Sequence, residues 1–135
     1  MIKTGSQIER DFYALISASS LGKGIKGKVY RSEMRPADAT SEDIIVKFLA
    51  GEDEQVQTGV VICNIYVPDV TKAKGRKVID HARIAELELL VLSFIENFDS
   101  SEYLIKTDGS MQTYLNEEIN QHLISVRIKF QRLNH

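Results

Sequence analysis

The sequence is poor in three residue types that shape many small proteins: it has no tryptophan, one cysteine and two prolines among 135 residues. A single cysteine, Cys63, excludes an intramolecular disulfide and a zinc cage built from cysteines. No apolar run approaches the roughly 18 residues that a membrane-spanning helix needs, and the first residues lack the apolar core of a signal peptide. We therefore expect a cytoplasmic protein that folds without disulfide bonds and does not enter a membrane.

The sequence also lacks an excess of positive charge. Its formal net charge is -2, whereas proteins that wrap nucleic acid owe their affinity to basic residues that neutralise phosphates. Nonspecific nucleic-acid binding is therefore disfavoured, and we expect no specific nucleic-acid partner. The hydrophobic share of 43% and the charged share of 27% are typical of a globular protein, and the length fits one domain. We expect residues 1–135 to form a single α+β domain.

The N-terminal region has the pattern of a capped amphipathic helix. Ser6 and Glu9 have the spacing of a capping box, in which each side chain bonds the backbone N–H of the other residue. Four apolar residues then fall on one helical face: Ile8, Phe12, Leu15 and Ile16. The helix is expected to end near Ser19 or Ser20. A flexible turn should follow, at Gly22, Gly24 and Gly27.

The central region is rich in residues that favour β-strands. Short strands are predicted at Lys28–Arg31 and Ile44–Leu49, and a long one at Val56–Val67. The polar segment Ala50–Gln55 is short enough to connect the last two as a hairpin. From Val60 onward the long strand is apolar on both faces, which is more apolar surface than two helices on one side can cover.

A long helix is predicted from about Val78 to Asn97. Its broad apolar stripe consists of Ile84, Leu87, Leu90, Val91, Phe94 and Ile95. Leu89 and Leu92 fall outside this stripe. A helix that packs only on one sheet face would not need these two leucines, so they indicate a further contact.

The last part of the chain predicts three strands. Tyr103–Ile105 and Met111–Leu115 flank an Asp-Gly turn signal and are expected to form a hairpin, followed by a polar loop or helical turn at 116–121. The final strand alternates between polar residues and the apolar residues Ile124, Val126, Ile128 and Phe130. The whole pattern predicts an α+β fold, with an antiparallel or mixed β-sheet and two helices packed on one face.

The sequence contains no recognisable catalytic or metal-binding motif. The three histidines, His81, His122 and His135, lack the spacing of metal-binding pairs. Cys63 lies in the middle of an apolar strand, where a buried and inert thiol is expected. There is no Gly-x-Ser-x-Gly elbow and no phosphate-binding loop. We therefore expect neither an enzyme nor a bound cofactor or metal.

Two clusters of opposite charge remain. One lies at the predicted hairpin tip and the other in the exposed connector Thr71–Lys77. Each cluster alone is typical of a solvated surface, but between head-to-tail neighbours the two could meet and give specificity. The candidate subunit interface therefore consists of Glu52, Asp53, Glu54, Lys72, Lys74, Arg76, Lys77, Leu89 and Leu92.

The order of the predicted elements is similar to that of a known family. A helix is followed by Gly27–Tyr30, a loop with Pro36, the strands Ile44–Leu49 and Gly59–Pro68, a long helix and a final strand. This order resembles the tail terminator and tail-completion proteins of long-tailed phages, including prophage-encoded relatives. The resemblance covers about residues 6–98 and the final strand. The stretch between Tyr103 and Gln121 is longer and more polar than is usual in that family.

The resemblance implies a structural α/β subunit without catalysis or cofactor. Its copies would close into a ring, typically a hexamer, that caps the tail tube and presents a surface to the head-tail connector proteins. Such a subunit would be cytoplasmic during assembly and part of the virion tail afterwards. The alternative is a small binding module that holds nucleic acid through the basic segment 72–83, together with Arg127 and Lys129.

Overall fold

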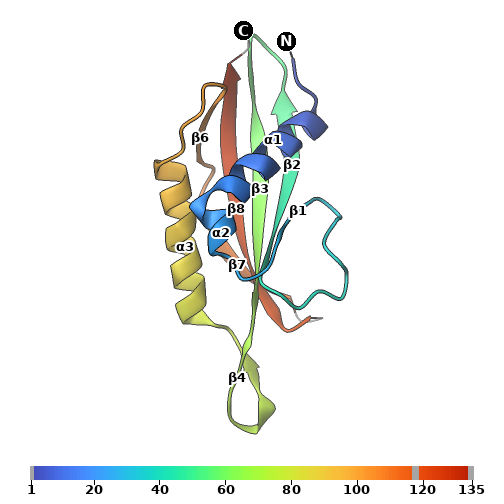
Figure 1. Ribbon diagram of the computed structural model, residues 1–135, viewed down its shortest axis with the longest axis vertical. Coiled ribbons are helices and arrows are strands. Elements are labelled where there is room, and N and C mark those ends of the chain that lie inside the picture. Colours follow the sequence, from blue (N-terminus) through green and yellow to red (C-terminus); the bar gives the residue numbers. More distant parts are fainter. Residues whose placement is uncertain (1, 117–118, 134–135) are drawn as a thin grey trace.

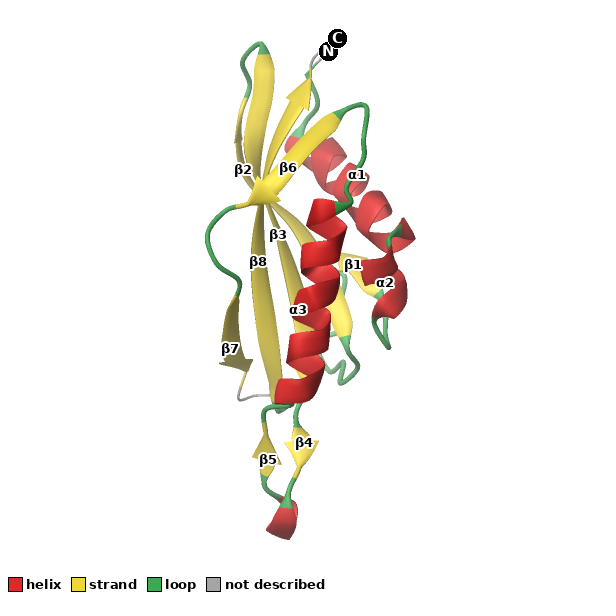
Figure 2. Ribbon diagram, turned by 90° about the vertical axis from the view of Figure 1, so that its left-hand side faces the viewer, coloured by secondary structure: helices red, strands yellow, loops and turns green. Residues whose placement is uncertain are grey.

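The computed structural model describes residues 2–116 and 119–133, and its helices lie on one side of one large sheet (Figure 1, Figure 2). The six strands of this sheet are β1 (Val29–Arg31), β2 (Asp43–Glu52), β3 (Val56–Pro68), β6 (Tyr103–Thr107), β7 (Gln112–Asn116) and β8 (Gln121–Leu133). The helices are α1 (Gly5–Ala18), α2 (Ser20–Gly24) and α3 (His81–Glu96). The expected α+β class with a mixed sheet is confirmed, because β1 runs parallel to β2 while β3, β6 and β7 each pair antiparallel.

The sheet is built around its two longest strands, β3 and β8. They pair antiparallel over their whole length, from Val56 opposite Leu133 to Pro68 opposite Gln121. The strand order is β1-β2-β3-β8-β6, and β7 also pairs with β8. Since directly opposed residues point to the same side of a sheet, the alternation of the two strands produces one apolar face and one mixed face.

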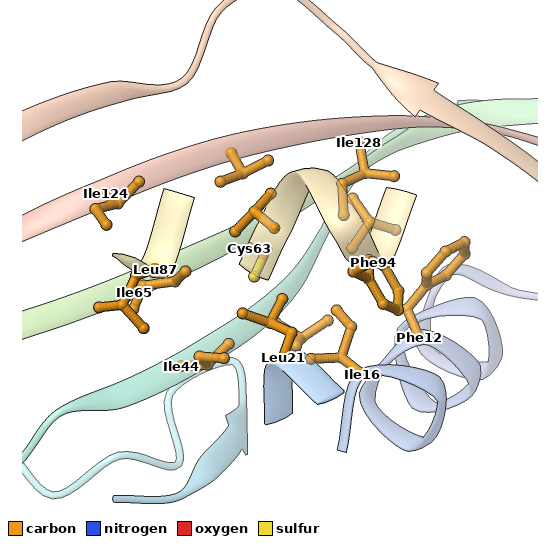
Figure 3. Close-up of a cluster of buried hydrophobic side chains, with 14 of the residues drawn as sticks. Phe12, Ile16, Leu21, Ile44, Cys63, Ile65, Leu87, Phe94, Ile124 and Ile128 are labelled. Atoms are coloured by element: carbon orange, nitrogen blue, oxygen red, sulfur yellow. The ribbon is translucent and has the colours of Figure 1, made fainter. Parts of the chain in front are cut away.

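The apolar face and the helices enclose the core, part of which is drawn in Figure 3. Phe12 of α1, Leu87 of α3 and Ile65 of β3 are completely buried in it, with Leu87 beside Ile65 and Phe12 at the other end of the cluster (Figure 3). Side chains of this size contribute about 1.5–3 kcal/mol each when they leave water. At one end, the core continues as an aromatic cluster, in which the ring centroids of Phe12 and Phe130 are 5.7 Å apart.

The N-cap of α1 lies two residues before the predicted cap, so the prediction of Ser6 and Glu9 as the capping box was wrong. Thr4 is the N-cap: its hydroxyl accepts from the Gln7 N–H at 3.2 Å, and Gln7 Oε1 accepts from the Thr4 N–H at 2.9 Å. Glu9 instead points inward, where its carboxylate accepts from Arg31 Nε and from the Phe48 N–H. A long-range contact therefore takes the side chain that the local pattern assigned to the cap.

The glycines after α1 do not form the predicted flexible turn, because Ser20–Gly24 is a short helix, α2. The α1 end near Ser19 is confirmed, and the Ser19 hydroxyl caps α2 by accepting from the Gly22 N–H at 3.3 Å. A Cβ atom at Gly22 would lie 2.2 Å from the carbonyl oxygen of Ile16. The glycine is required there by a close backbone approach rather than by flexibility.

Helix α3 covers the sheet as predicted, but it starts at His81 rather than near Val78. Asp80 caps it by accepting from the Arg83 N–H at 3.1 Å. The residues before it belong to a small two-stranded hairpin formed by β4 (Val70–Thr71) and β5 (Lys77–Val78), with a 3-10 turn at Ala73–Gly75. This hairpin, 69–80, projects beyond the end of the main sheet (Figure 1, Figure 2), and we call it the basic arm.

Strands β6 and β7 do not pair with each other, so the predicted hairpin between them was wrong. The chain does turn at the Asp-Gly signal, where Gly109 has a positive φ of 82°. Each of the two strands pairs antiparallel with β8, β6 along Ile128–Arg132 and β7 along Gln121–Ser125. A strand of 13 residues is long enough to hold two five-residue partners one after the other on the same edge.

Candidate functional site

The two charged clusters of the candidate interface lie at opposite ends of β3. Glu52, Asp53 and Glu54 are exposed at the turn that precedes β3, whereas the basic arm follows its last residue, Pro68. Figure 1 shows the β2–β3 turn at one end of the long axis and the arm at the other. The clusters therefore cannot neutralise each other within one copy, which leaves a contact between copies as the way for them to meet.

The acidic end is tied to the N-terminal segment. Asp53 Oδ1 accepts from Gln57 Nε2 at 2.7 Å, and the same amide nitrogen donates to the Lys3 carbonyl at 2.9 Å. Gln57 Oε1 in turn accepts from the Lys3 N–H at 3.0 Å. Gln57 is fully buried, so these bonds are shielded from water and hold the turn in place.

The basic arm presents its cations to solvent. Its basic side chains, Lys72, Lys74, Arg76 and Lys77, are all exposed, and none forms an ion pair with a residue that the structure describes. The turn is sharp, with positive φ angles of 63° at Lys74 and 74° at Gly75. At its base, Asp69 bonds His122 Nδ1 at 2.6 Å and donates its N–H to the Asn120 carbonyl at 3.0 Å.

Helix α3 exposes Leu89 and Leu92, the two leucines that lie outside its apolar stripe. Leu89 is 67% exposed and Leu92 is 41% exposed, which confirms that neither packs against the sheet. Their neighbours on the outward side are acidic, since Glu88 and Glu96 flank Leu92 at four-residue spacing. The outward side of α3 is therefore both apolar and negatively charged.

Arg83 is the basic residue of α3, and it faces the body of the protein. Its guanidinium binds Glu42 at 2.6 Å and donates to the Gly24 carbonyl at 2.8 Å. The hydrogen bond to Glu42 raises the pKa of Arg83 above its ordinary value. Arg83 thus clamps α3 to the end of α2, and it is not available to the basic segment 72–83 that the sequence suggested for nucleic acid.

A buried ion pair missed by the sequence analysis covers one end of the open side of the sheet. Asp43 Oδ2 accepts from Arg35 Nε at 2.9 Å, and both side chains are less than a tenth exposed. Burial alone would raise the pKa of Asp43, but hydrogen bonds from the Lys28 N–H, Ser41 and Arg35 outweigh it and lower the pKa. The Arg35 guanidinium also lies 4.1 Å from the ring centroid of Tyr66.

The cysteine and the histidines have different surroundings. Burial raises the pKa of the Cys63 thiol to about 12, which confirms the predicted buried and inert cysteine. His81 is exposed at the start of α3, and His122 bonds Asp69, while His135 lies outside the described residues. Within 2–116 and 119–133, no group of three or more His, Cys, Asp or Glu side chains is arranged to hold a metal ion. No helix in these ranges is long and apolar enough to cross a bilayer.

The side of the sheet opposite the helices, which we call the open face, is the feature that sequence reasoning did not resolve. The alternating residues of β8 predicted that one side of this strand is polar. The register of β2, β3, β8 and β6 decides which residues become neighbours on the open face. That register places Lys47, Ile62 and Arg127 in one row, and Val60, Lys129 and Lys106 in the next. The open face is thus a mixture of cations and half-buried apolar side chains.

Comparison of the sequence with family models and with curated proteins identifies no relative. No protein-family model matches the sequence, and no curated protein is significantly similar to it. The resemblance to phage tail terminator and tail-completion proteins therefore stays a prediction from the order of the elements in the sequence.

Proposed function

We propose that the protein is a structural subunit that works by self-assembly, as a tail terminator or tail-completion protein of a long-tailed phage or prophage. The observation that carries the proposal is the surface a single copy leaves uncovered. The outward leucines of α3 are exposed, and none of the described helices lies against the open face. Apolar surface of this kind is commonly buried against another subunit.

The charge distribution along the long axis supports the same proposal. An acidic end and a basic arm at opposite ends of one strand are complementary between two copies but not within one. Complementary charges of this kind favour the correct partner orientation and speed encounter. A closed ring would use each end once per subunit, with the tail tube and the head-tail connector proteins as neighbours of the finished ring.

Association of the purified protein tests the proposal. Sedimentation velocity over a concentration series at low salt should show species larger than the monomer, and negative-stain images of them should show closed rings. Reversing the arm with Lys74→Glu and Arg76→Glu should weaken association, whereas Lys23→Glu and Lys26→Glu, exposed lysines elsewhere, should leave it unchanged. A strict monomer up to millimolar concentration, with and without a tail tube, would contradict the proposal.

A small nucleic-acid-binding module is the second candidate, because the arm carries four exposed cations without an acidic partner among the described residues. A gel-shift assay with duplex DNA should then show an affinity that falls steeply with salt. Replacing Lys72 and Lys77 with glutamine should reduce the salt dependence. Arg127 adds less to such a surface than the sequence suggested, because its Nε donates to Asp108 at 3.2 Å.

A further inference from the structure

The open face carries a row of cations that the fold does not neutralise. Lys106 of β6 and Lys129 of β8 are directly opposite each other in the ladder. Like charges at directly opposed positions destabilise a sheet, and neither lysine forms an ion pair with a described residue. Lys47 lies on the same face, on β2. The sheet therefore tolerates a repulsion that an external carboxylate would relieve.

Apolar side chains lie between these cations. Ile45 and Ile62 are half-buried in the middle of the open face, and Leu104 at its β6 edge is 57% exposed. A surface that alternates cations with aliphatic groups matches a partner that offers carboxylates and aliphatic groups together.

The outward side of α3 offers this combination. Glu88, Leu92 and Glu96 follow one another at four-residue spacing and Leu89 lies beside them, so leucines and carboxylates share one stripe. Neither Glu88 nor Glu96 forms an ion pair with a described residue. Figure 2 shows α3 on one side of the sheet, whereas the open face is the other side, so the two surfaces of one copy cannot touch.

We propose that the outward side of α3 in one copy packs against the open face of the next copy. Leu89 and Leu92 lie on Ile45 and Ile62, while Glu88 and Glu96 approach Lys106 and Lys129. The inference rests on the proposed function and names its subunit contact. It differs from the contact between the acidic end and the basic arm, which joins the ends of the molecule rather than its two broad sides.

The contact is heterologous, because it uses two different surfaces of the same chain. A heterologous contact closes into a ring when the rotation between neighbours divides a full turn, and otherwise it continues as a filament. A second copy would cover both the exposed leucines and the lysines of the open face, whereas nucleic acid would cover only the lysines. Phosphates could neutralise the lysines, but they would leave Leu89 and Leu92 in water.

Charge reversal on each side tests the contact. The sheet variant is Lys106→Glu with Lys129→Glu, and the helix variant is Glu88→Lys with Glu96→Lys. Each alone places like charges across the proposed contact, so the association constant measured by sedimentation at low salt should fall about tenfold or more. Two matched controls change the net charge equally on other exposed residues: Lys23→Glu with Lys26→Glu, and Glu33→Lys with Asp38→Lys.

Restoration separates a specific contact from a general effect of charge. A 1:1 mixture of the sheet and helix variants should associate again, because each reversed surface meets its complement. A single chain carrying all four reversals should also self-associate. Circular dichroism and thermal unfolding of each variant confirm that the monomer is folded.

Three results would overturn the contact. The first is a chain that forms oligomers whose association the reversals leave unchanged, which refutes the contact but not the proposed function. The second is a loss of association that neither the mixture nor the fourfold variant restores. The third is a monomeric chain whose Lys106 and Lys129 bind duplex DNA in a salt-dependent manner, which refutes both.

Discussion

The two faces of the sheet differ in what lies against them. On the side of the helices, Ile65 of β3 and Ile124 of β8 are opposite each other and fully buried. On the open face, Ile62 and Arg127 are opposite each other, and Ile62 is only half-buried. The same two strands thus supply a stable core on one side and an uncovered, cationic surface on the other.

The comparison teaches that stability and assembly are assigned to different residues of the same strands. Because side chains alternate along a strand, a substitution on one face leaves the other face in place. Changes on the covered face should act on the free energy of unfolding, and changes on the open face should act on association. The following predictions test that division, from the largest expected effect to the smallest.

Removing core volume should give the largest loss of stability. Ile65→Ala should lower the free energy of unfolding by about 2–5 kcal/mol, since it leaves a cavity in a packed core. Ile62→Ala, three residues earlier on the same strand but on the open face, is the matched control. Urea denaturation of both variants measures the difference. An equal loss for the two variants would show that the open face is packed as tightly as the core.

Breaking the ion pair under the loop 32–42 should have the next largest effect. Asp43→Ala leaves the Arg35 guanidinium buried without its carboxylate, and losses of about 3–5 kcal/mol are typical of such changes. The Arg35 contact with Tyr66 should also loosen, which exposes more of the open face. Thermal unfolding and tyrosine fluorescence measure the two effects. Asp38→Ala, at an exposed position of the same loop, should change neither.

Stability should fall as the solution becomes acidic. The folded chain lowers the pKa of Glu9, Asp43 and Glu102 below their ordinary values of 4.5, 3.8 and 4.5. For each carboxyl, burial opposes ionisation, but hydrogen bonds to the ionised form outweigh it. A lowered pKa contributes stability that is present above the unfolded value and is lost as pH falls through the folded one. Urea midpoints measured between pH 6 and pH 3 should decline below about pH 4.5, less steeply in Glu102→Gln.

Relieving the lysine pair should give the smallest effect, and one of opposite sign. Lys129→Gln removes a like-charge contact with Lys106, so the monomer should gain a few tenths of a kcal/mol, in line with about 0.2–1 kcal/mol for cross-strand pairs. The gain should shrink at high salt, because screening weakens the repulsion in the parent protein. Lys23→Gln is the control. A loss of stability would indicate that Lys129 has a favourable contact within its own chain.

Much of the sheet was predictable because its signals are local. The alternation of Ile124, Val126, Ile128 and Phe130 predicted the buried face of β8, and the apolar run around Cys63 predicted that thiol's burial. Leu89 and Leu92 were also predictable as exposed, since they depart from the stripe of their own helix. The residues of one element are enough to decide features of this kind.

The remaining features depend on contacts between distant segments. The patterns at Thr4 and Ser6 both fit a capping box, and only the burial of Glu9 near Arg31 decides between them. The turn at Gly109 was recognisable, but the length of β8 decides that β6 and β7 pair with it instead of with each other. The lysine pair of the open face likewise exists only in the register between β6 and β8.

The position of β8 affects when the fold can form. It pairs with β3, β6 and β7, yet it follows all of them along the chain. During synthesis, the ladder of β3 toward β8 stays unpaired until the ribosome has released residues 121–133, and exposed strand edges of this kind favour aggregation. Folding of the sheet is therefore dominated by pairing between residues far apart in sequence, which is slow relative to helix formation.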